Sequence, residues 1–361
     1  MLIFSLMIFM IIFAWFLLKK MDNKKAKGRK LNIKLIYCII CSIALVAIAG
    51  LRAPSNDFGD DTMYMGNFEY VQKHDFPEVY KQFKLLDTEP VFYLGTKVVS
   101  LVSTNYNVLL IVCAIPVVLA ISWMIYKHSK MPMLSYLLFS CAFFYLWSLV
   151  ILRQAIAMSA IVFAIEFLIK KKYWKFIIAV ALAALFHRTA LIFLLALPIS
   201  FMPYTKKSPI IFAILSVAMI VFGGLIISNG LQLFSNMWHY SAYLTREASF
   251  GNWKQIAKYV IYAVMIVVTI LISKSDDRKR DKIPIYLCMT GCLLCALAPF
   301  FAETFRLGLY FMLPVIVILP NAIAGVEDSK KKLLYSGALT AGLVVLGFAT
   351  FYSMGYTSII L

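Results

Sequence analysis

The chain has 361 residues, of which 62% are hydrophobic and 14% charged, and it carries a formal net charge of +18. Soluble domains have roughly a quarter charged residues, so this composition excludes an ordinary soluble protein. Apolar runs of about 20 residues, such as 108–126, 210–228 and 333–352, are typical of membrane-spanning helices. They are too long and too uniformly apolar for barrel strands. The sequence therefore predicts an all-α, polytopic integral membrane helical bundle, with a single transmembrane domain over residues 1–361.

The basic residues lie in short clusters between the apolar runs. Residues 19–34 alone carry eight Lys and Arg. The other clusters are 127–130, 170–175, 206–207, 274–282 and 330–332. This pattern is typical of cytoplasmic loops, so each cluster is predicted to face the cytoplasm, and nucleic acid is not expected as a partner.

The predicted helices follow one another from an N-terminus on the outer side. The first, over 2–18, lacks a basic start and a small-residue cleavage site, so we interpret it as a retained helix. A second helix over 35–51 leads to an outer-face loop, 52–105, in which residues 89–103 are a candidate surface helix. Three helices that end near residues 126, 150 and 170 come next.

The apolar segment 175–203 has a cytoplasmic cluster at each end and carries His187 and Arg188 inside it. We favour a hairpin of two short helices that turns at the outer side around these two residues. The alternative is one kinked helix, which would place the five basic residues of 274–282 outside. The first leg, 174–187, spans about 21 Å, less than the ~30 Å hydrocarbon core, so it ends inside the membrane or meets a water-filled cavity.

The remaining helices are predicted over 210–228, 256–273, 284–301, 306–324 and 333–352, which gives about twelve with both termini outside. A second outer-face loop, 229–254, contains Trp238, His239, Tyr240 and Tyr243. These aromatic rings either stack on sugars or form the belt of an interfacial helix.

Three cysteines on one face of the helix over 284–301 also admit two interpretations. Cys288, Cys292 and Cys295 are spaced for a metal ion or pack as small residues against a neighbouring helix. No histidine or carboxylate joins them, so we favour packing.

Polar residues gather at the predicted outer ends of the helices. They are Arg153, Gln154, His187, Arg188, Glu303, Arg306 and Tyr310, together with Asp57, Asp60, Asp61 and Tyr64 of the acidic loop NDFGDDTMY. An ionised group at membrane depth costs at least ~2.5–3.5 kcal/mol, so such groups are functional candidates. Four of these groups also have a structural interpretation: a snorkelling Arg153, a capping His187, a Glu303–Arg306 ion pair and a solvated Asp60–Asp61 turn.

Together these residue types suit glycosyl transfer from a lipid diphosphate. Arginine recognises phosphate through a rigid fork of donors and can stabilise a diphosphate leaving group. A histidine can take the proton of an attacking hydroxyl. Carboxylates and aromatic rings bind sugars. Such a site could work without a metal, and we see no DxD-type metal pair beyond Asp60–Asp61 and no nucleotide-binding loop, so no cofactor is predicted.

Three blocks of the sequence resemble the EpsG family of bacterial polysaccharide polymerases. The central block is RQAIAMSAIVFAIEFLIKKKYWKFIIAVALAALFHRTALIFLLALP, and the outer two are GDDTMY and ETFRLGLYFMLPVIVILP. The resemblance covers residues 51–324. It points to Arg153, His187 and Arg306 as catalytic. Its secondary positions are Gln154, Asp60, Asp61 and Tyr64, and we add Arg188, Glu303 and Tyr310 as candidate substrate-binding residues.

The resemblance implies a Wzy-like polymerase of GT-C-like architecture in the bacterial cytoplasmic membrane. Such an enzyme joins oligosaccharide repeat units carried on undecaprenyl diphosphate into exopolysaccharide, capsule or O-antigen at the outer face. Membrane lipids, chain-length regulators and a flippase are its candidate partners. Two alternatives stay open. A flippase would extend its polar residues to the cytoplasmic side, and a membrane O-acyltransferase would admit an acyl donor from inside.

Overall fold

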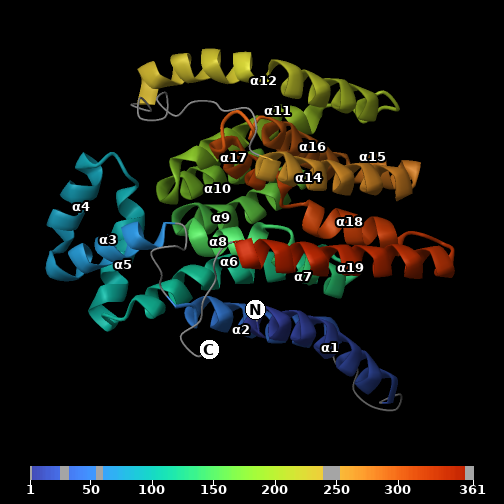
Figure 1. The fold of residues 1–361 in the computed structure, drawn as a ribbon, viewed down its shortest axis with the longest axis horizontal. Helices are drawn as coiled ribbons and strands as arrows, with labels where there is room; N and C mark the ends of the chain where they lie inside the picture. The colour runs from blue at the N-terminus through green and yellow to red at the C-terminus, as the bar shows by residue number, and fades with distance from the viewer. Residues whose placement is uncertain (1, 25–31, 54–59, 239–252, 354–361) are drawn as a thin grey trace. The chain divides into compact units, whose positions relative to one another are not determined.

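The computed structural model describes residues 2–24, 32–53, 60–238 and 253–353. Every regular element in these ranges is a helix, and no strand forms in them (Figure 1). The chain divides into two compact units, Met1–Leu191 with Glu327–Leu361, and Ile192–Val326. The all-helical prediction is confirmed for the described part of the chain.

The first unit contains eleven of the helices. They are α1 (Leu2–Lys24), α2 (Ile33–Gly50), α3 (Asp61–Lys73), α4 (Phe76–Leu85), α5 (Pro90–Val102), α6 (Tyr106–His128), α7 (Pro132–Cys141), α8 (Phe144–Val150), α9 (Leu152–Ile169), α10 (Tyr173–Phe186) and α19 (Ser329–Ser353). Helix α6 packs against α2 and α9, and α9 packs against α10. Buried hydroxyls link α2 to α6 and α8: Ser42 pairs with Ser122 at 2.7 Å, and Tyr145 of α8 donates to the Leu45 carbonyl at 2.6 Å. In lipid, apolar contact alone does not determine which helices associate, and hydrogen bonds of this kind help to determine it.

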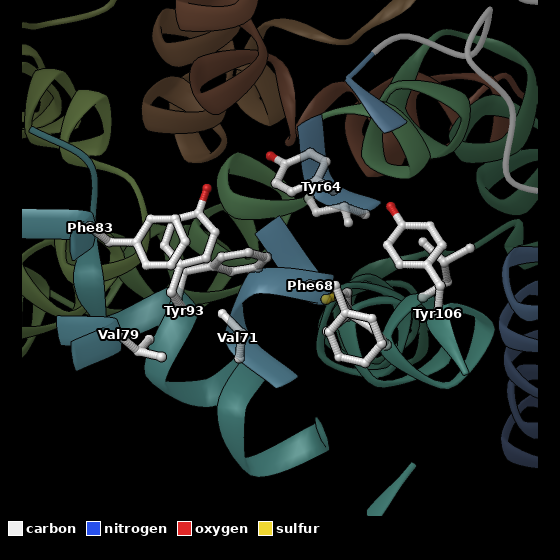
Figure 2. Close-up of a cluster of buried hydrophobic side chains, with 12 residues drawn as sticks. Tyr64, Phe68, Val71, Val79, Phe83, Tyr93 and Tyr106 are labelled. Atoms are coloured by element: carbon white, nitrogen blue, oxygen red, sulfur yellow. The ribbon is translucent and has the colours of Figure 1, made fainter. Parts of the chain in front are cut away.

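The predicted outer-face loop folds into α3, α4 and α5, which we call the helical cap. Local signals explain the helix starts: Asp75 and Glu78 form a reciprocal capping box at α4, and Pro90 occupies the first turn of α5. One buried cluster joins the helical cap to the first turns of α6 and α9 (Figure 2). Its members are Tyr64, Phe68, Val71, Val79, Phe83, Phe92, Tyr93, Tyr106, Leu109, Leu110, Cys113 and Leu152. The cluster fixes the loop before α5 relative to the start of α9.

In the second unit the other α-helices pack against α16. They are α11 (Ala196–Phe201), α12 (Ser208–Trp238), α14 (Trp253–Ile272), α15 (Ser275–Arg280), α16 (Lys282–Ala296), α17 (Glu303–Met312) and α18 (Val315–Ala324). A 3-10 helix, η1 (Arg188–Leu195), precedes α11.

Helices α16 and α17 cross closely at two glycines. A Cβ on Gly291 would lie 2.8 Å from the Gly308 carbonyl oxygen, so only hydrogen fits there. Cys288, Cys292 and Cys295 are buried along the same helix, and the Cys295 sulfur lies against Gly308. This arrangement agrees with the packing interpretation of the three cysteines.

Seven helices in the described residues are long and apolar enough to cross a membrane, or nine if the bent pairs α7–α8 (43°) and α17–α18 (49°) each count as one span. The segments Tyr173–Phe186, Arg188–Phe201 and Lys282–Ala296 are apolar but shorter. A multi-pass membrane protein is confirmed, whereas the predicted count of about twelve spans is not. In the predicted loop 229–254, residues 239–252 and the Trp238 side chain lie outside what the structure describes.

Candidate functional site

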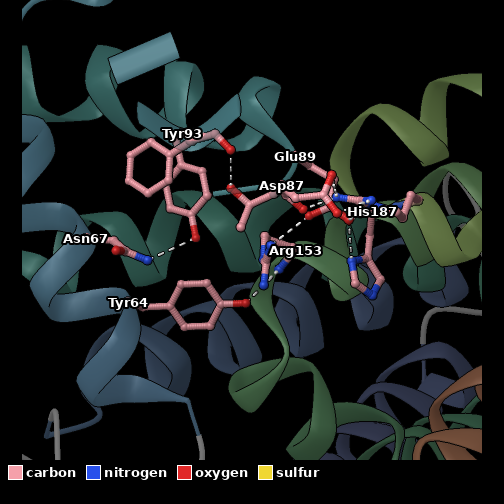
Figure 3. A network of polar contacts seen from close by, with 10 residues as sticks. Tyr64, Asn67, Asp87, Glu89, Tyr93, Arg153 and His187 are labelled. Atoms are coloured by element: carbon pink, nitrogen blue, oxygen red, sulfur yellow. Dashed lines mark hydrogen bonds and ion pairs between the residues drawn. The ribbon is translucent and has the colours of Figure 1, made fainter. Parts of the chain in front are cut away.

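The polar site of the first unit is centred on Glu89, which the sequence analysis did not select (Figure 3). Its carboxylate accepts hydrogen bonds from Arg153 Nη1 at 2.7 Å and from the Arg188 backbone N–H at 2.9 Å. Arg153 binds Oε2 of this carboxylate, whereas the Arg188 N–H binds Oε1, and the Nδ1 atom of His187 lies 3.0 Å from the same Oε1. Glu89 is only 7% exposed. Three of the predicted site residues therefore meet at one buried anion.

The turn before α5 places this carboxylate. Glu89 is the N-cap residue of α5, but its side chain does not bond to the helix, so it can reach α9 and α10. Two residues earlier, Asp87 adopts a left-handed conformation with φ of 51°, which aspartate tolerates better than most residues. The Asp87 carboxylate accepts from Arg188 Nη1 at 3.1 Å, and its carbonyl accepts from Nη2.

Arg153 lies in the first turn of α9, among aromatic side chains of the helical cap. Its guanidinium carbon is 6.0 Å from the centroid of the Tyr93 ring, and its backbone N–H donates to the Tyr64 hydroxyl at 3.4 Å. Burial raises the pKa of Tyr64 to about 12 and also raises that of Tyr93, so both hydroxyls stay neutral. The Nε atom of Arg153 is buried and has no hydrogen-bond partner among the described residues. An unsatisfied buried donor costs about 1–3 kcal/mol, which favours binding of an added acceptor.

His187 lies where α10 ends. It has an extended backbone, with φ of −156° and ψ of 109°, and the chain continues as η1. Because Nδ1 faces Glu89, the other ring nitrogen, Nε2, points away from that bond, and no hydrogen bond to it occurs within the described ranges. The side chain is 22% exposed. In the tautomer that donates from Nδ1, Nε2 carries a lone pair that can accept a proton.

The site holds Glu89 as an anion. Burial by itself raises the pKa of Glu89, but the hydrogen bond and charge of His187, the charge of Arg153 and the Arg188 N–H outweigh it and lower the pKa to about 2. The carboxylate is therefore ionised across the physiological range, and it favours a proton on Nδ1 of His187.

The remaining candidates of the first unit lie around this centre or apart from it. Asp61 is fully buried and forms an ion pair with Arg52, with a 2.8 Å bond from Nη2 to Oδ1, and it also accepts from Tyr106 at 3.2 Å. Asp60 precedes it at the start of α3, and Gln154 is buried in α9. Asp57 lies outside the described residues. Asp61 is thus engaged in holding α3 against the end of α2.

The second unit holds the other three candidates. Arg306 and Glu303 form an ion pair of 3.2 Å across the first turn of α17, the alternative that the sequence left open. Tyr310 is fully buried in the same helix. Across the described residues of both units, no group of three or more His, Cys, Asp or Glu side chains is placed to hold a metal ion.

The far end of α9 carries a second buried carboxylate. Glu166 receives Lys127 at 2.5 Å, His128 at 2.8 Å and Lys170 at 2.7 Å. Because Arg153 and Glu166 are 13 residues apart in α9, the two polar groups are separated by about 20 Å along the helix axis. The Glu89 and Glu166 groups are therefore distinct sites at opposite ends of one helix.

Glu89 escaped the sequence analysis because its partners are 64 to 99 residues away in the chain. One signal was available. Charged groups at membrane depth are usually paired, so a set of predicted cations at Arg153, His187 and Arg188 requires a nearby carboxylate.

Comparisons with known proteins identify a family. A model described as the EpsG family matches residues 34–360, nearly the whole chain. Comparison with curated proteins finds no match, and comparison with solved structures also finds none. The resemblance seen in the sequence motifs is therefore confirmed by a match that extends well beyond them, and the chain belongs to the EpsG family.

Proposed function

We propose that this protein is a polysaccharide polymerase that joins lipid-diphosphate-linked oligosaccharide units at the outer face of the cytoplasmic membrane. The observation that carries the proposal is the meeting of Arg153, Arg188 and His187 on Glu89, at the ends of α9 and α10. Membership of the EpsG family supports a polysaccharide product. As part of the same proposal, the lipid carrier is undecaprenyl diphosphate, and the polymer is exopolysaccharide, capsule or O-antigen.

His187 is the proposed general base. Glu89 accepts a hydrogen bond from Nδ1–H and orients the ring so that Nε2 can face the acceptor hydroxyl, as carboxylates orient histidines in hydrolases. The acceptor oxygen attacks the anomeric carbon of the donor sugar, and its proton passes to Nε2. A new C–O bond forms as the C–O bond to the diphosphate breaks, and the bonding electrons leave with the lipid diphosphate.

The arginines would stabilise the departing diphosphate. A guanidinium has five N–H donors, and Arg153 uses one of them on Glu89 while its buried Nε has no hydrogen-bond partner in the part of the chain that the structure describes. Donors that are already oriented toward developing charge are worth far more in a dry site than in water. In the second unit, Arg306 is the corresponding proposed residue, with Glu303 and Tyr310 beside it in α17.

The outer orientation is supported by the distribution of charge along α9. The end that carries Glu166 contacts Lys127 and Lys170 and leads into the lysines of 170–175, whereas the described ion-pair partners of Glu89 are Arg153, His187 and Arg188, with no lysine among them. Cytoplasmic ends of membrane helices carry excess Lys and Arg. The Glu89 site is accordingly assigned to the outer side, where repeat units are expected.

The test uses cells that lack the protein, complemented with wild type, His187→Ala or His128→Ala. Lipid-linked and released glycans are separated on a gel. We expect single repeat units to accumulate in the deletion and with His187→Ala, with polymerisation down by roughly 10²–10⁴-fold. The His128→Ala control, at the far end of α9, should make long polymer.

Two results would overturn the proposal. Long polymer from His187→Ala at normal protein level would remove the general base. Precursors trapped on the cytoplasmic leaflet of the deletion strain would identify a flippase instead.

A further inference from the structure

We infer that α5 of the helical cap is an interfacial helix, embedded with its apolar face among the acyl chains of the outer leaflet, so that the lipid bilayer is its partner. The inference rests on the proposed function for the choice of leaflet, because that proposal assigns the Glu89 end of α9 to the outer side. The embedding itself is argued from the residues of α5 and their contacts.

The polarity of α5 is the reverse of that of a helix in water. Its buried side carries Phe92, Tyr93, Thr96 and Lys97, and Tyr93 points into the buried cluster of the helical cap (Figure 2). The Lys97 residue is only 8% exposed. Lysine is almost never buried in this way unless it is paired. A helix that bordered water would turn its lysine outward and its valines inward.

The opposite side of α5 is aliphatic. Val98, Leu101 and Val102 are 55%, 66% and 83% exposed, and Val91 and Leu94 are half-buried. The spacing of these five residues places them on one face of the helix. Gly95 is the other exposed position of α5, so none of its exposed residues is polar. A face of this kind, on a protein that spans a membrane, is suited to hydrocarbon rather than to water.

Every polar side chain of α5 is bonded inside the protein. The Tyr93 hydroxyl accepts from an asparagine of α3 at 3.0 Å. Lys97 donates from Nζ to the Val71 carbonyl at 3.0 Å, in the last turn of α3, where helix carbonyls lack partners of their own. Thr96 and Ser100 donate to carbonyls of α5 itself at 3.0 and 2.8 Å. Hydrocarbon offers no partner to a polar group, so this internal pairing is what a helix in lipid requires.

The neighbours of α5 belong to the membrane part of the first unit. It packs against α6, a candidate membrane span, and against the apolar helix α10. These helices also expose aliphatic side chains, such as Leu119 of α6 at 55% and Leu182 of α10 at 51%. The thirteen residues of α5 extend about 20 Å, less than the ~30 Å hydrocarbon core, so α5 does not cross the membrane and stays at one side of it.

The other helices of the cap set a contrast. Helix α4 exposes Glu78, Lys81 and Lys84 beside Tyr80 and Leu85, a mixture that suits water and lipid headgroups. The helical cap therefore has an aqueous side at α4 and a hydrocarbon side at α5.

This placement has a consequence for the Glu89 site. Glu89 is the N-cap residue of α5, so a helix embedded among acyl chains fixes its carboxylate close to the boundary between hydrocarbon and headgroups. The diphosphate of a lipid-linked substrate lies at the same depth. Such a substrate would reach Arg153 and His187 without leaving the bilayer.

The experiment measures the depth of α5 by spin labelling of the full-length protein in phosphatidylcholine nanodiscs. A nitroxide is attached to Val98→Cys, Leu101→Cys or Val102→Cys, and Lys81→Cys on α4 is the matched control. The seven native cysteines are buried, and the parent protein measures their background labelling. We expect the ratio of oxygen to nickel-chelate accessibility to be about fivefold or more above that of Lys81→Cys, because oxygen enters hydrocarbon and a polar chelate is excluded from it.

Two results would overturn the embedding. A ratio equal to that of Lys81→Cys at all three positions means that the face borders water. Low accessibility to both probes means that protein covers the face, either another segment of this chain or a second copy. The three variants replace exposed side chains and should unfold at the temperature of the parent protein, so either result reports on a folded protein.

The leaflet is tested separately with a membrane-impermeant maleimide on spheroplasts that carry Thr104→Cys, an exposed position between α5 and α6. Labelling of intact spheroplasts supports the outer leaflet. Labelling only after permeabilisation overturns the outer side, and with it the proposed function, while the spin-label ratios still decide the embedding. If Val98→Cys borders water while His187→Ala abolishes polymer, the polymerase stands and the embedding falls.

Discussion

At each end of α9 a buried carboxylate is neutralised by basic side chains, but the kind and the exposure of these side chains differ. Each end has one buried carboxylate, Glu89 or Glu166, with side chains 8% and 7% exposed, and each carboxylate collects three basic residues. At the Glu166 end the partners are two lysines and a histidine that are 36–48% exposed. At the Glu89 end they are two arginines and a histidine that are 17–28% exposed.

The difference separates a structural anchor from a candidate reaction centre. Lysine is a strongly hydrated point charge, so the cations that bind Glu166 stay partly in water and are screened by it. The Glu89 group is drier, and its donors are rigid and directional. Similar numbers of charges therefore do not indicate similar functions, and exposure and donor geometry distinguish them.

The largest effect is expected when the two carboxylates are neutralised in parallel. Glu89→Gln removes the charge that holds His187 in one tautomer, so polymerisation should fall by about 100-fold or more. Glu166→Gln frees only exposed cations and should change activity by less than about threefold. Glycan gels of both variants at matched protein levels provide the measurement, and equal losses would mean that Glu89 is merely structural.

The second prediction exchanges the two kinds of cation. Arg153→Lys keeps the charge but loses the fork, so we expect roughly a tenfold loss of activity. Lys170→Arg at the other end should behave as wild type. Chain-length distribution and the amount of unpolymerised unit report both variants, and full activity of Arg153→Lys would contradict a diphosphate role for this residue.

The third prediction concerns pH. The pKa of Glu89 is lowered in the folded protein to about 2 from 4.5, so its contribution to stability is present above pH 4.5 and is lost as the pH falls toward 2. At pH 3 the purified protein should have lost about 2 kcal/mol from this group. Thermal unfolding at pH 7 and pH 3 should show a smaller difference for Glu89→Gln, and an identical difference would contradict the assigned pKa.

The smallest effect is expected just beyond the Glu166 end. Lys171 has a left-handed φ of 56° and ends α9 in a Schellman motif, with the Lys172 N–H bonded to the Phe167 carbonyl at 2.8 Å. Lys171→Gly should stabilise the protein by about 1 kcal/mol, because glycine adopts this conformation without strain. Lys172→Gly, where φ is −91°, should not raise the unfolding temperature.

The sequence predicted the long apolar helices well, because twenty apolar residues in a row have few alternatives to a span. It also predicted the short leg, found as α10 over Tyr173–Phe186, and the break at His187. The number of membrane spans was predicted less well. At Phe143 a left-handed residue bends α7 into α8, and no glycine or proline in the sequence marks that position.

The site was predicted only in part, for a topological reason. Arg153, His187 and Arg188 were selected because charge is conspicuous in an apolar run. Glu89 lies in a polar segment, where a carboxylate is unremarkable until α3–α5 fold onto α9. Residues 89–103 were predicted as a candidate surface helix, but which of its faces is buried depends on how α5 packs against α3, α6 and α10.

The fourteen residues of α10 have a consequence for the lipids around the protein. A helix of that length covers about 21 Å, less than the ~30 Å hydrocarbon core, so either one end of it stays inside the membrane or the bilayer becomes thinner beside it, at a cost of fractions of a kcal/mol for each Å of mismatch. Short or unsaturated acyl chains reduce that cost and bring the headgroup layer closer to the end of the helix. If the proposed polymerase function holds, the fatty-acid composition of the host membrane should thus change the rate of polymerisation, and growth at a different temperature should alter polymer length without any change in the protein sequence.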